Sequence, residues 1–287
     1  MSADLLGLLW APFLMCLVLT GMHAYLGVHV LAREVVFVDI ALAQIAALGA
    51  TAAFLLGFDL DTWPSYAAGL ALTIVGAMVL ALTRTRERHV SQEAVIGVVY
   101  AVSSAAAVLL ADRAPHGVEH VRAMLVGNLL ATQPADVLKV AGLYALVGTL
   151  HVLCRRPFFL ISTDPAAAFA QGYRVRLWDF VFYASFGVVV TSSVRVGGVL
   201  LVFSYLIVPA LAGVILGQKL RSKLVIGWIF GAAVSILGVG ASAMLDLPTG
   251  ATVVTVFGVA LLAIWLARQV RGGRPVTGRS VLRSSPK

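Results

Sequence analysis

Long apolar runs separated by short polar clusters fill the chain as far as about residue 268. An α-helix crosses the hydrocarbon core of a bilayer with about 20 residues, so each run is long enough, or nearly so, to span a membrane. The pattern predicts an all-α transmembrane bundle of eight or nine spans. The candidate spans are Leu5–Leu26, Val36–Gly57, Tyr66–Thr83, Ala94–Ala111, Val137–Cys154, Leu177–Val194, Gly197–Leu216, Leu224–Leu245 and Gly250–Ala267.

The composition agrees with a membrane protein. Hydrophobic residues make up 60% of the chain and charged residues 12%, which is too little polar surface for a soluble domain. The first residues, Met1 to Asp4, contain no basic residue, so we interpret the first span as a retained helix and not a cleaved signal. Cys16 and Cys154 each lie inside an apolar run and are interpreted as packing residues.

Lysine and arginine residues are distributed unequally between the two sides that nine spans define. Seventeen of the 21 fall on the side of the carboxyl terminus, and four fall on the other. Cytoplasmic loops carry an excess of lysine and arginine, which predicts an external amino terminus and a cytoplasmic carboxyl terminus. The basic residues expected outside are Arg113, Arg122, Lys139 and Arg195.

The domain organisation follows from the same pattern. We expect one transmembrane domain over residues 1–268 and a basic, disordered cytoplasmic tail over residues 269–287. The apolar run Ala123–Ala131 is too short to span and is interpreted as an interfacial or re-entrant piece. Basic residues lie in short clusters between spans, so no nucleic-acid partner is expected. The sequence has no P-loop pattern, so ATP hydrolysis by this chain is not expected either. No cofactor is expected.

The second span carries two polar residues, Asp39 and Gln44, inside an apolar helix. Such residues are costly in a membrane unless they face protein or water, and they mark substrate pathways. Small residues at Ala46, Gly49 and Ala53 let a neighbouring helix approach closely. We interpret this span as lining a pathway. The alternative is a packing helix whose polar groups are hydrogen-bonded inside the bundle.

A short helix is predicted outside the membrane over about residues 163–173. Asp164 can cap its start, Pro165 suits the first helical position and Gly172 suits the end. Phe169 and Tyr173 are four residues apart and would share one face. Exposed aromatic residues on so short a helix predict docking into another protein. The alternative is packing against the membrane surface.

Two further segments are informative. Pro209 inside the seventh span predicts a kink, and Asp246 to Gly250 predict an outer turn. Taken together and in this order, the segments resemble the integral permeases of bacterial ABC transporters that import zinc, manganese or iron. The matching motifs are an arginine-led start of the second span at Arg33, Gly127-Asn128, the Asp-Pro-x-x-Ala helix at Asp164, Pro165 and Ala168, the stretch from Val196 to Ala210, and the Leu-Pro-Thr-Gly turn from Leu247 to Gly250.

The second span departs from the family pattern, which has an aspartate and a histidine four residues apart. Gln44 stands at the histidine position and Ile40 at the aspartate position. Asp39 and Gln44 are five residues apart, or about 140° around a helix. They therefore cannot form the same paired site, and an amide oxygen is a weaker zinc ligand than imidazole. The resemblance thus implies the fold and the transporter role, with Asp39 as a candidate metal ligand.

Other candidate ligands are histidines. His23 and His29 lie near the end of the first span, six residues apart and about 120° from a shared face. We consider both as pathway residues, with packed core histidines as the alternative. His116, Glu119 and His120 match the spacing of an inverted zinc-protease motif, but Pro115 and Gly117 oppose the helix that this motif needs. They are candidate metal ligands at an outer mouth, or a chance match.

The resemblance implies a multi-pass permease subunit in the bacterial inner membrane. Its partners would be a cytoplasmic ATPase docked on residues Asp164 to Tyr173, an extracytoplasmic solute-binding protein, a second permease copy and the lipid bilayer. The substrate would be a divalent transition metal, free or in a chelate. Two other classes stay open: a proton-coupled secondary transporter using Asp39 and Asp179, and an intramembrane metalloenzyme using His116, Glu119 and His120.

Overall fold

The computed structural model describes residues 3–59, 62–84, 91–113 and 126–270, and within these ranges the fold is helical without strands. The all-α prediction is therefore confirmed. The elements are α1 (Ala3–Arg33), α2 (Val38–Leu55), α3 (Trp63–Leu82), α4 (Gln92–Ala111), the 3-10 turn η1 (Leu129–Ala131), α6 (Pro134–Leu153), α7 (Arg155–Thr163), α8 (Pro165–Ala170), α9 (Val175–Leu216), α10 (Leu220–Leu245) and α11 (Thr249–Val270).

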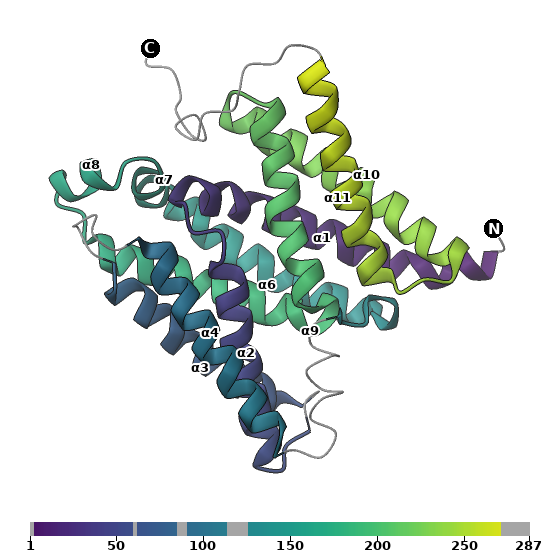
Figure 1. The fold of residues 1–287 in the computed structure, drawn as a ribbon, viewed down its shortest axis with the longest axis horizontal. Coiled ribbons are helices and arrows are strands. Elements are labelled where there is room, and N and C mark those ends of the chain that lie inside the picture. The colour runs from purple at the N-terminus through teal and green to yellow at the C-terminus, as the bar shows by residue number, and fades with distance from the viewer. Residues whose placement is uncertain (1–2, 60–61, 85–90, 114–125, 271–287) are drawn as a thin grey trace.

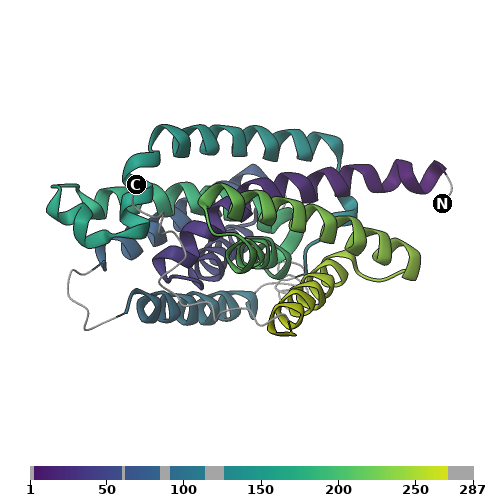
Figure 2. The same cartoon turned by 90° about the horizontal axis from the view of Figure 1, so that it is seen from above.

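Eight of the described helices are long and apolar enough to cross a membrane. The sixth and seventh predicted spans both lie in α9, which has 42 residues. At about 1.5 Å per residue, such a helix is about twice as long as a hydrocarbon core of about 30 Å. Its backbone is interrupted at Gly198 (φ 75°, ψ 163°), and the two arms leave this residue in different directions (Figures 1 and 2). One helix thus accounts for two predicted spans.

The break in the α9 backbone lies at Gly198, a position that was not singled out from the sequence. Pro209, where a kink is predicted, lies within the helical second arm. A positive φ with an extended ψ is a conformation that essentially only glycine adopts. The chain therefore turns where glycine permits it, and the second arm of α9 continues through the proline.

Helix α1 and the two arms of α9 form the centre of the molecule. Helices α2, α3 and α4 form a group below them in Figure 1, α10 and α11 pack on the other side, and α6 lies along one flank in Figure 2. Glycines allow the close contacts. A Cβ at Gly49 of α2 would lie 2.6 Å from the carbonyl oxygen of Ala68 in α3. The small residues of the second span thus bring α3 close, as predicted.

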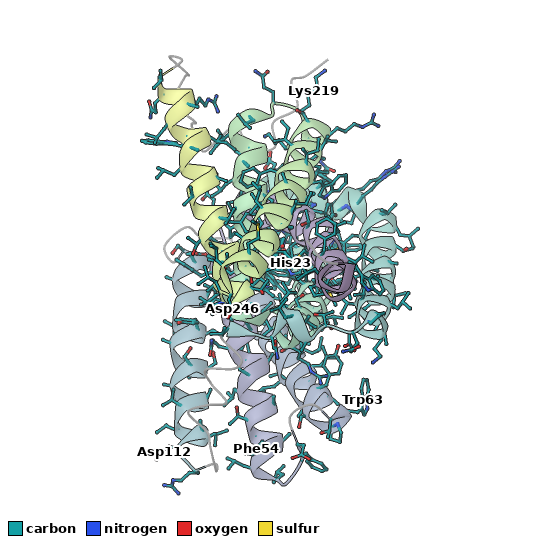
Figure 3. The ribbon with its side chains drawn as sticks, turned by 90° about the vertical axis from the view of Figure 1, so that its right-hand side faces the viewer. His23, Phe54, Trp63, Asp112, Lys219 and Asp246 are labelled. Carbon is teal, nitrogen blue, oxygen red and sulfur yellow. The ribbon has the colours of Figure 1, made fainter. Side chains whose placement is uncertain are left out.

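Several helix ends lie at opposite ends of the bundle in Figure 3. Trp63 and Asp112, which the predicted topology places near the outer surface, lie at one end, and Lys219, which it places inside, lies at the other. Asp246 lies between these two ends. Asp246 is left-handed (φ 52°) and links α10 to α11, so the predicted turn is confirmed. Helix α7 was not predicted: its first residues are basic, whereas Phe158 and Ile161 are buried.

Candidate functional site

Asp39 lies in the first turn of α2 and is 1% exposed. Its Oδ1 atom is enclosed and has no hydrogen-bond partner. The start of α2 is capped by another residue, because Glu93 of α4 accepts a hydrogen bond from the Phe37 amide at 3.1 Å. Arg33, a possible partner by sequence, binds other groups. Asp39 is therefore a buried carboxylate with an unused acceptor, which is costly unless a cation or a proton donor reaches it.

Gln44 lies on a different face of α2 from Asp39. Ile40, Gln44 and Leu48 are four residues apart and are all partly exposed, whereas most other residues of this helix are buried. They form one stripe, as the helical repeat requires. The expectation that Asp39 and Gln44 do not converge agrees with this geometry. The positions of the family's aspartate and histidine, held here by Ile40 and Gln44, both lie on this stripe.

His23 and His29 are fully buried in α1 and belong to two separate hydrogen-bond networks. The Nε2 atom of His23 lies 3.2 Å from Ser193 Oγ in the first arm of α9, and this serine also contacts the Tyr144 hydroxyl. The Nδ1 atom of His29 lies 3.0 Å from Ser162 Oγ in α7. Serine hydroxyls therefore occupy one nitrogen of each ring. In the part of the chain that the structure describes, no three His, Cys, Asp or Glu side chains gather as a metal site.

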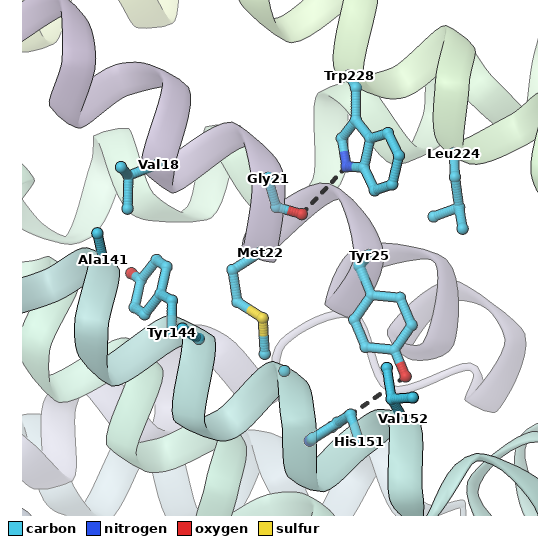
Figure 4. Close-up of a pocket in the computed structure, with 12 residues that line it drawn as sticks. Val18, Gly21, Met22, Tyr25, Ala141, Tyr144, His151, Val152, Leu224 and Trp228 are labelled. Carbon is cyan, nitrogen blue, oxygen red and sulfur yellow. Dashed lines mark hydrogen bonds between the residues drawn. The ribbon is translucent and has the colours of Figure 1, made fainter.

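A third histidine, His151 of α6, was not among the candidate residues identified from the sequence. Its Nε2 atom lies 2.9 Å from Ser185 Oγ, and its Nδ1 atom lies 3.3 Å from the Tyr25 hydroxyl. Tyr25 and His151 border a groove of about 450 Å³ between α1, α6 and α10 (Figure 4). The sequence could have identified His151 as a candidate, because it is a lone histidine in an apolar span.

Buried charges gather at the ends of α1 and α3, around Asp179 of α9. The Arg33 Nη1 atom donates to Asp179 Oδ1 at 2.6 Å, and Arg84 Nε lies 3.4 Å from Asp179 Oδ2. Arg33 Nε also donates to Ser162 Oγ at 2.8 Å. We call Arg33, Arg84, Ser162 and Asp179 the inner charge network. Removing one partner of a buried ion pair costs about 3–5 kcal/mol, because the other charge stays uncompensated.

Helix α8 projects at the far left of Figure 1, next to α7. Asp164 caps it as predicted, accepting a hydrogen bond from the Ala167 amide at 2.9 Å. The predicted length is wrong: α8 ends at Ala170, and Gly172 is left-handed (φ 78°). This glycine reverses the chain, so Tyr173 lies beyond the helix.

The aromatic residues of this segment are not its exposed face. Phe169 and Tyr173 are partly buried and pack against the cluster of Ile161, Ala168 and Val175. The exposed residues of α8 are instead Ala166 and Ala170, which are four apart and share one face. The expectation of exposed aromatic residues is wrong, because these side chains hold α8 against α7 and α9.

Three of the motifs that resemble the family meet at one point: Gly127-Asn128, the stretch that begins at Val196 and the turn that ends at Gly250. Gly127 is left-handed (φ 66°), and a Cβ there would overlap the backbone of Gly197. The Asn128 amide donates to the Val196 carbonyl at 3.2 Å. A Cβ at Gly250 would lie 2.9 Å from the carbonyl oxygen of the residue before Gly127. We call this contact the glycine node. His116, Glu119 and His120 lie outside the described residues.

Comparisons with known proteins agree with this arrangement. The model of the ABC-3 (ABC 3 transport) family matches residues 7–268. The manganese transport system membrane protein MntC of Listeria monocytogenes is 27% identical over 183 residues, which is 64% of this chain and 65% of that relative. The chelated iron transport system membrane protein YfeC of Yersinia pestis is 25% identical over 235 residues, covering 81% of this chain and 76% of that relative.

Solved structures share the fold. PsaBC from Streptococcus pneumoniae, solved in complex with Fab, superposes with a TM-score of 0.76 at 18% identity, over 94% of this chain and 100% of that one. An inward-facing putative metal-chelate type ABC transporter gives a TM-score of 0.69 at 17% identity, over 90% of this chain and 85% of that one. The family match covers nearly the whole described bundle and includes every motif named above. The chain therefore belongs to the ABC-3 transport family.

Proposed function

We propose that this protein is the membrane-spanning permease subunit of an ABC importer that moves a divalent transition metal into the cytoplasm. The metal would be zinc, manganese or iron, free or in a chelate. Family membership supports this function, as do relatives whose names specify manganese and chelated iron transport. The protein would lie in the bacterial inner membrane and act as a pair of copies. A separate ATPase would drive it, and a solute-binding protein would deliver the metal outside.

Helix α8 is the observation that carries this proposal. It is a capped helix of six residues that is too short to span a membrane and lies beside α7 at one end of the molecule. Its buried side chains hold it against α7 and α9, whereas Ala166 and Ala170 are exposed. Small exposed side chains on a firmly held helix suit insertion into a groove of a partner. A carrier without an ATPase has no use for such a helix.

The metal route is proposed along α2. Asp39 offers an acceptor oxygen without a hydrogen-bond partner, and Gln44 lies on the partly exposed stripe. Serine contacts hold His23 and His29 in place beside this route. The enclosed Nε2 atom of His29 has no hydrogen-bond partner, so both histidines stay candidate pathway residues. His116, Glu119 and His120 stay candidates for a collecting site at the outer mouth.

A proton-coupled carrier that relays protons between Asp39 and Asp179 is less well supported. Both oxygens of Asp179 face guanidinium groups, at 2.6 Å and 3.4 Å. These ion pairs link α9 to the last residue of α1 and to the segment after α3. Asp179 is therefore placed to hold helices together, and the buried acid left for transport is Asp39.

Changing Ala166 to Glu tests the docking of the ATPase. A charge on the exposed face of α8 would have to lose its water on docking, which opposes association. We expect co-purification of the ATPase with the tagged permease to fall at least about tenfold, the equivalent of about 1.4 kcal/mol. The permease itself should still insert, because glutamate is favourable in the first turn of a helix.

Ala135→Glu is the matched control. Ala135 is also exposed, and it also follows a proline at the first position of its helix, α6. The same change there should leave the ATPase complex intact. Equal co-purification of the ATPase with the Ala166→Glu and parent proteins would show that α8 is not the docking element.

A further inference from the structure

A single guanidinium group joins both ends of the segment that contains α8. Ser162 lies at the end of α7, before α8, and Asp179 lies in α9, after it. Arg33 donates to both, from Nε to Ser162 at 2.8 Å and from Nη1 to Asp179 at 2.6 Å. The whole segment between them is therefore fastened at two points to the last residue of α1.

The same network reaches two other parts of the bundle. Arg84, two residues after the end of α3, lies 3.4 Å from the second oxygen of Asp179. The link from Arg33 to α2 is only four residues long, because α2 begins at Val38. A displacement of α7 and α8 would thus move the ends of α1 and α3 together, and through α1 the start of α2, where Asp39 lies.

The burial of these charges needs an explanation beyond folding. The side chains of Arg33 and Asp179 are 0% exposed. Buried ion pairs are often no more stable than well-packed apolar residues of similar size, so stability alone does not require them. Hydrogen-bonded ion pairs are directional, because they fix which groups face each other, whereas apolar contacts are not. Two helices joined by such an ion pair would move together, whereas two helices in apolar contact could slide past each other.

We propose that the inner charge network transmits the ATP-driven displacement of α8 to α1, α2 and α3, with Arg33, Arg84 and Asp179 as positioning residues. This inference rests on the proposed function as an ATPase-driven permease. It assigns to these residues the coupling of ATP hydrolysis to transport, and not contact with the metal. Their loss should therefore change how many ions move for each ATP hydrolysed.

The test compares metal uptake and ATP hydrolysis in the same vesicles, reconstituted with permease, ATPase and binding protein. Two variants break the network: Asp179→Asn, and the double variant Arg33→Met with Asp179→Leu. The double variant replaces the ion pair with apolar groups, which keeps packing and leaves neither charge buried alone. Arg84 is 12% exposed and can turn to water.

We expect both variants to retain the ATPase and to hydrolyse ATP, while manganese uptake per ATP falls by about two- to thirty-fold, the range that such coupling residues span. Normal uptake per ATP in the double variant would overturn the proposal, because apolar packing would then suffice. If the double variant does not assemble, the same measurement is made on Ser162→Ala. This change removes the bonds from Arg33 and His29, and an unchanged ratio there would also overturn the proposal.

A control and a second readout separate this inference from the proposed function. Asp136→Asn breaks an exposed ion pair with Lys139 in α6 and should leave the ratio unchanged. Loss of the ATPase from the parent complex, or no metal uptake by the parent, would contradict the proposed function itself. A parent that transports and variants that couple normally would contradict only the role of the network.

Discussion

Asp39 and Asp179, the two buried acids among the described residues, differ in their surroundings. Asp179 lies between two guanidinium groups, whereas Asp39 has an enclosed oxygen without a hydrogen-bond partner. An uncompensated carboxylate in a membrane helix is expensive, so its retention favours a role in binding a cation. This contrast favours Asp39 as the acid that meets the metal and Asp179 as a residue that links helices.

Changing Asp39 to Asn should abolish most transport without harming the fold. Asparagine keeps the size and hydrogen-bonding capacity but removes the charge that attracts a metal ion. Uptake of radioactive manganese or zinc should fall at least about tenfold, which corresponds to about 1.4 kcal/mol in one binding step. The amount of protein in the membrane and its association with the ATPase should not change.

The exposed Asp136→Asn variant serves as the comparison and should transport normally, because Asp136 lies on the surface of α6 beside Lys139. Full uptake by a well-inserted Asp39→Asn protein would remove this carboxylate from the mechanism. The acid would then be a packing residue of α2.

Single residues were predictable where the signal was local. A five-residue spacing was enough to predict that Asp39 and Gln44 lie on different faces of α2. The partners of Arg33 were not predictable, because Ser162 and Asp179 are 129 and 146 residues away in sequence. No helical repeat brings such residues together. Only the packing of α1 against α7 and α9 does so.

At the scale of elements, the break in α9 is the feature with the strictest requirement on sequence. Gly198 adopts φ 75° and ψ 163°, and the glycine node packs against the neighbouring Gly197. A side chain at residue 198 would be strained by the backbone alone. The angle between the two arms of α9 therefore depends on one glycine.

Gly198→Ala should destabilise the purified protein by about 1–3 kcal/mol, the usual cost of a backbone conformation that alanine avoids. The measurement is the temperature at which half of the detergent-solubilised protein aggregates. Gly142→Ala is the control, because Gly142 is helical and a Cβ there meets no atom within 4 Å. That change should be neutral or stabilising by up to about 1 kcal/mol. Equal melting of both variants would mean that α9 does not need glycine at its break.

Elements were predicted well where length and hydrophobicity decide them. Every candidate span lies wholly or almost wholly in a described helix, because a membrane span must satisfy its own backbone hydrogen bonds. Helix α7 was missed because its nine residues mix Arg155 and Arg156 with apolar side chains. The end of α8 was misplaced for a similar reason. Gly172 was recognised as a stop, but the aromatic residues on either side of it were assigned to one helix face.

At the scale of the whole molecule, the predicted orientation assigns the two ends of the bundle to opposite sides of the membrane. Lys219 marks the end expected in the cytoplasm, and Trp63 and Asp112 mark the end expected outside (Figure 3). The excess of basic residues on one side predicts this orientation. The described helices agree with the predicted orientation if each arm of α9 crosses the membrane once.

Reporter fusions should confirm the orientation. A reporter that works only in the cytoplasm should be active when fused after Lys287. A reporter that works only outside should be active when inserted at the exposed turn residue Asp59. A reversed result at either position would contradict the assignment of the sides.

A double crossing of α9 would also limit how two copies of the chain can be joined in one gene. With both arms crossing, the described helices make an odd number of passes, so the start of α1 and the end of α11 face opposite compartments. A single-chain tandem of two copies would then place the second copy upside down unless a further spanning helix were added to the linker. Mixed pairs of parent and variant copies are therefore better made by co-expressing two differently tagged genes.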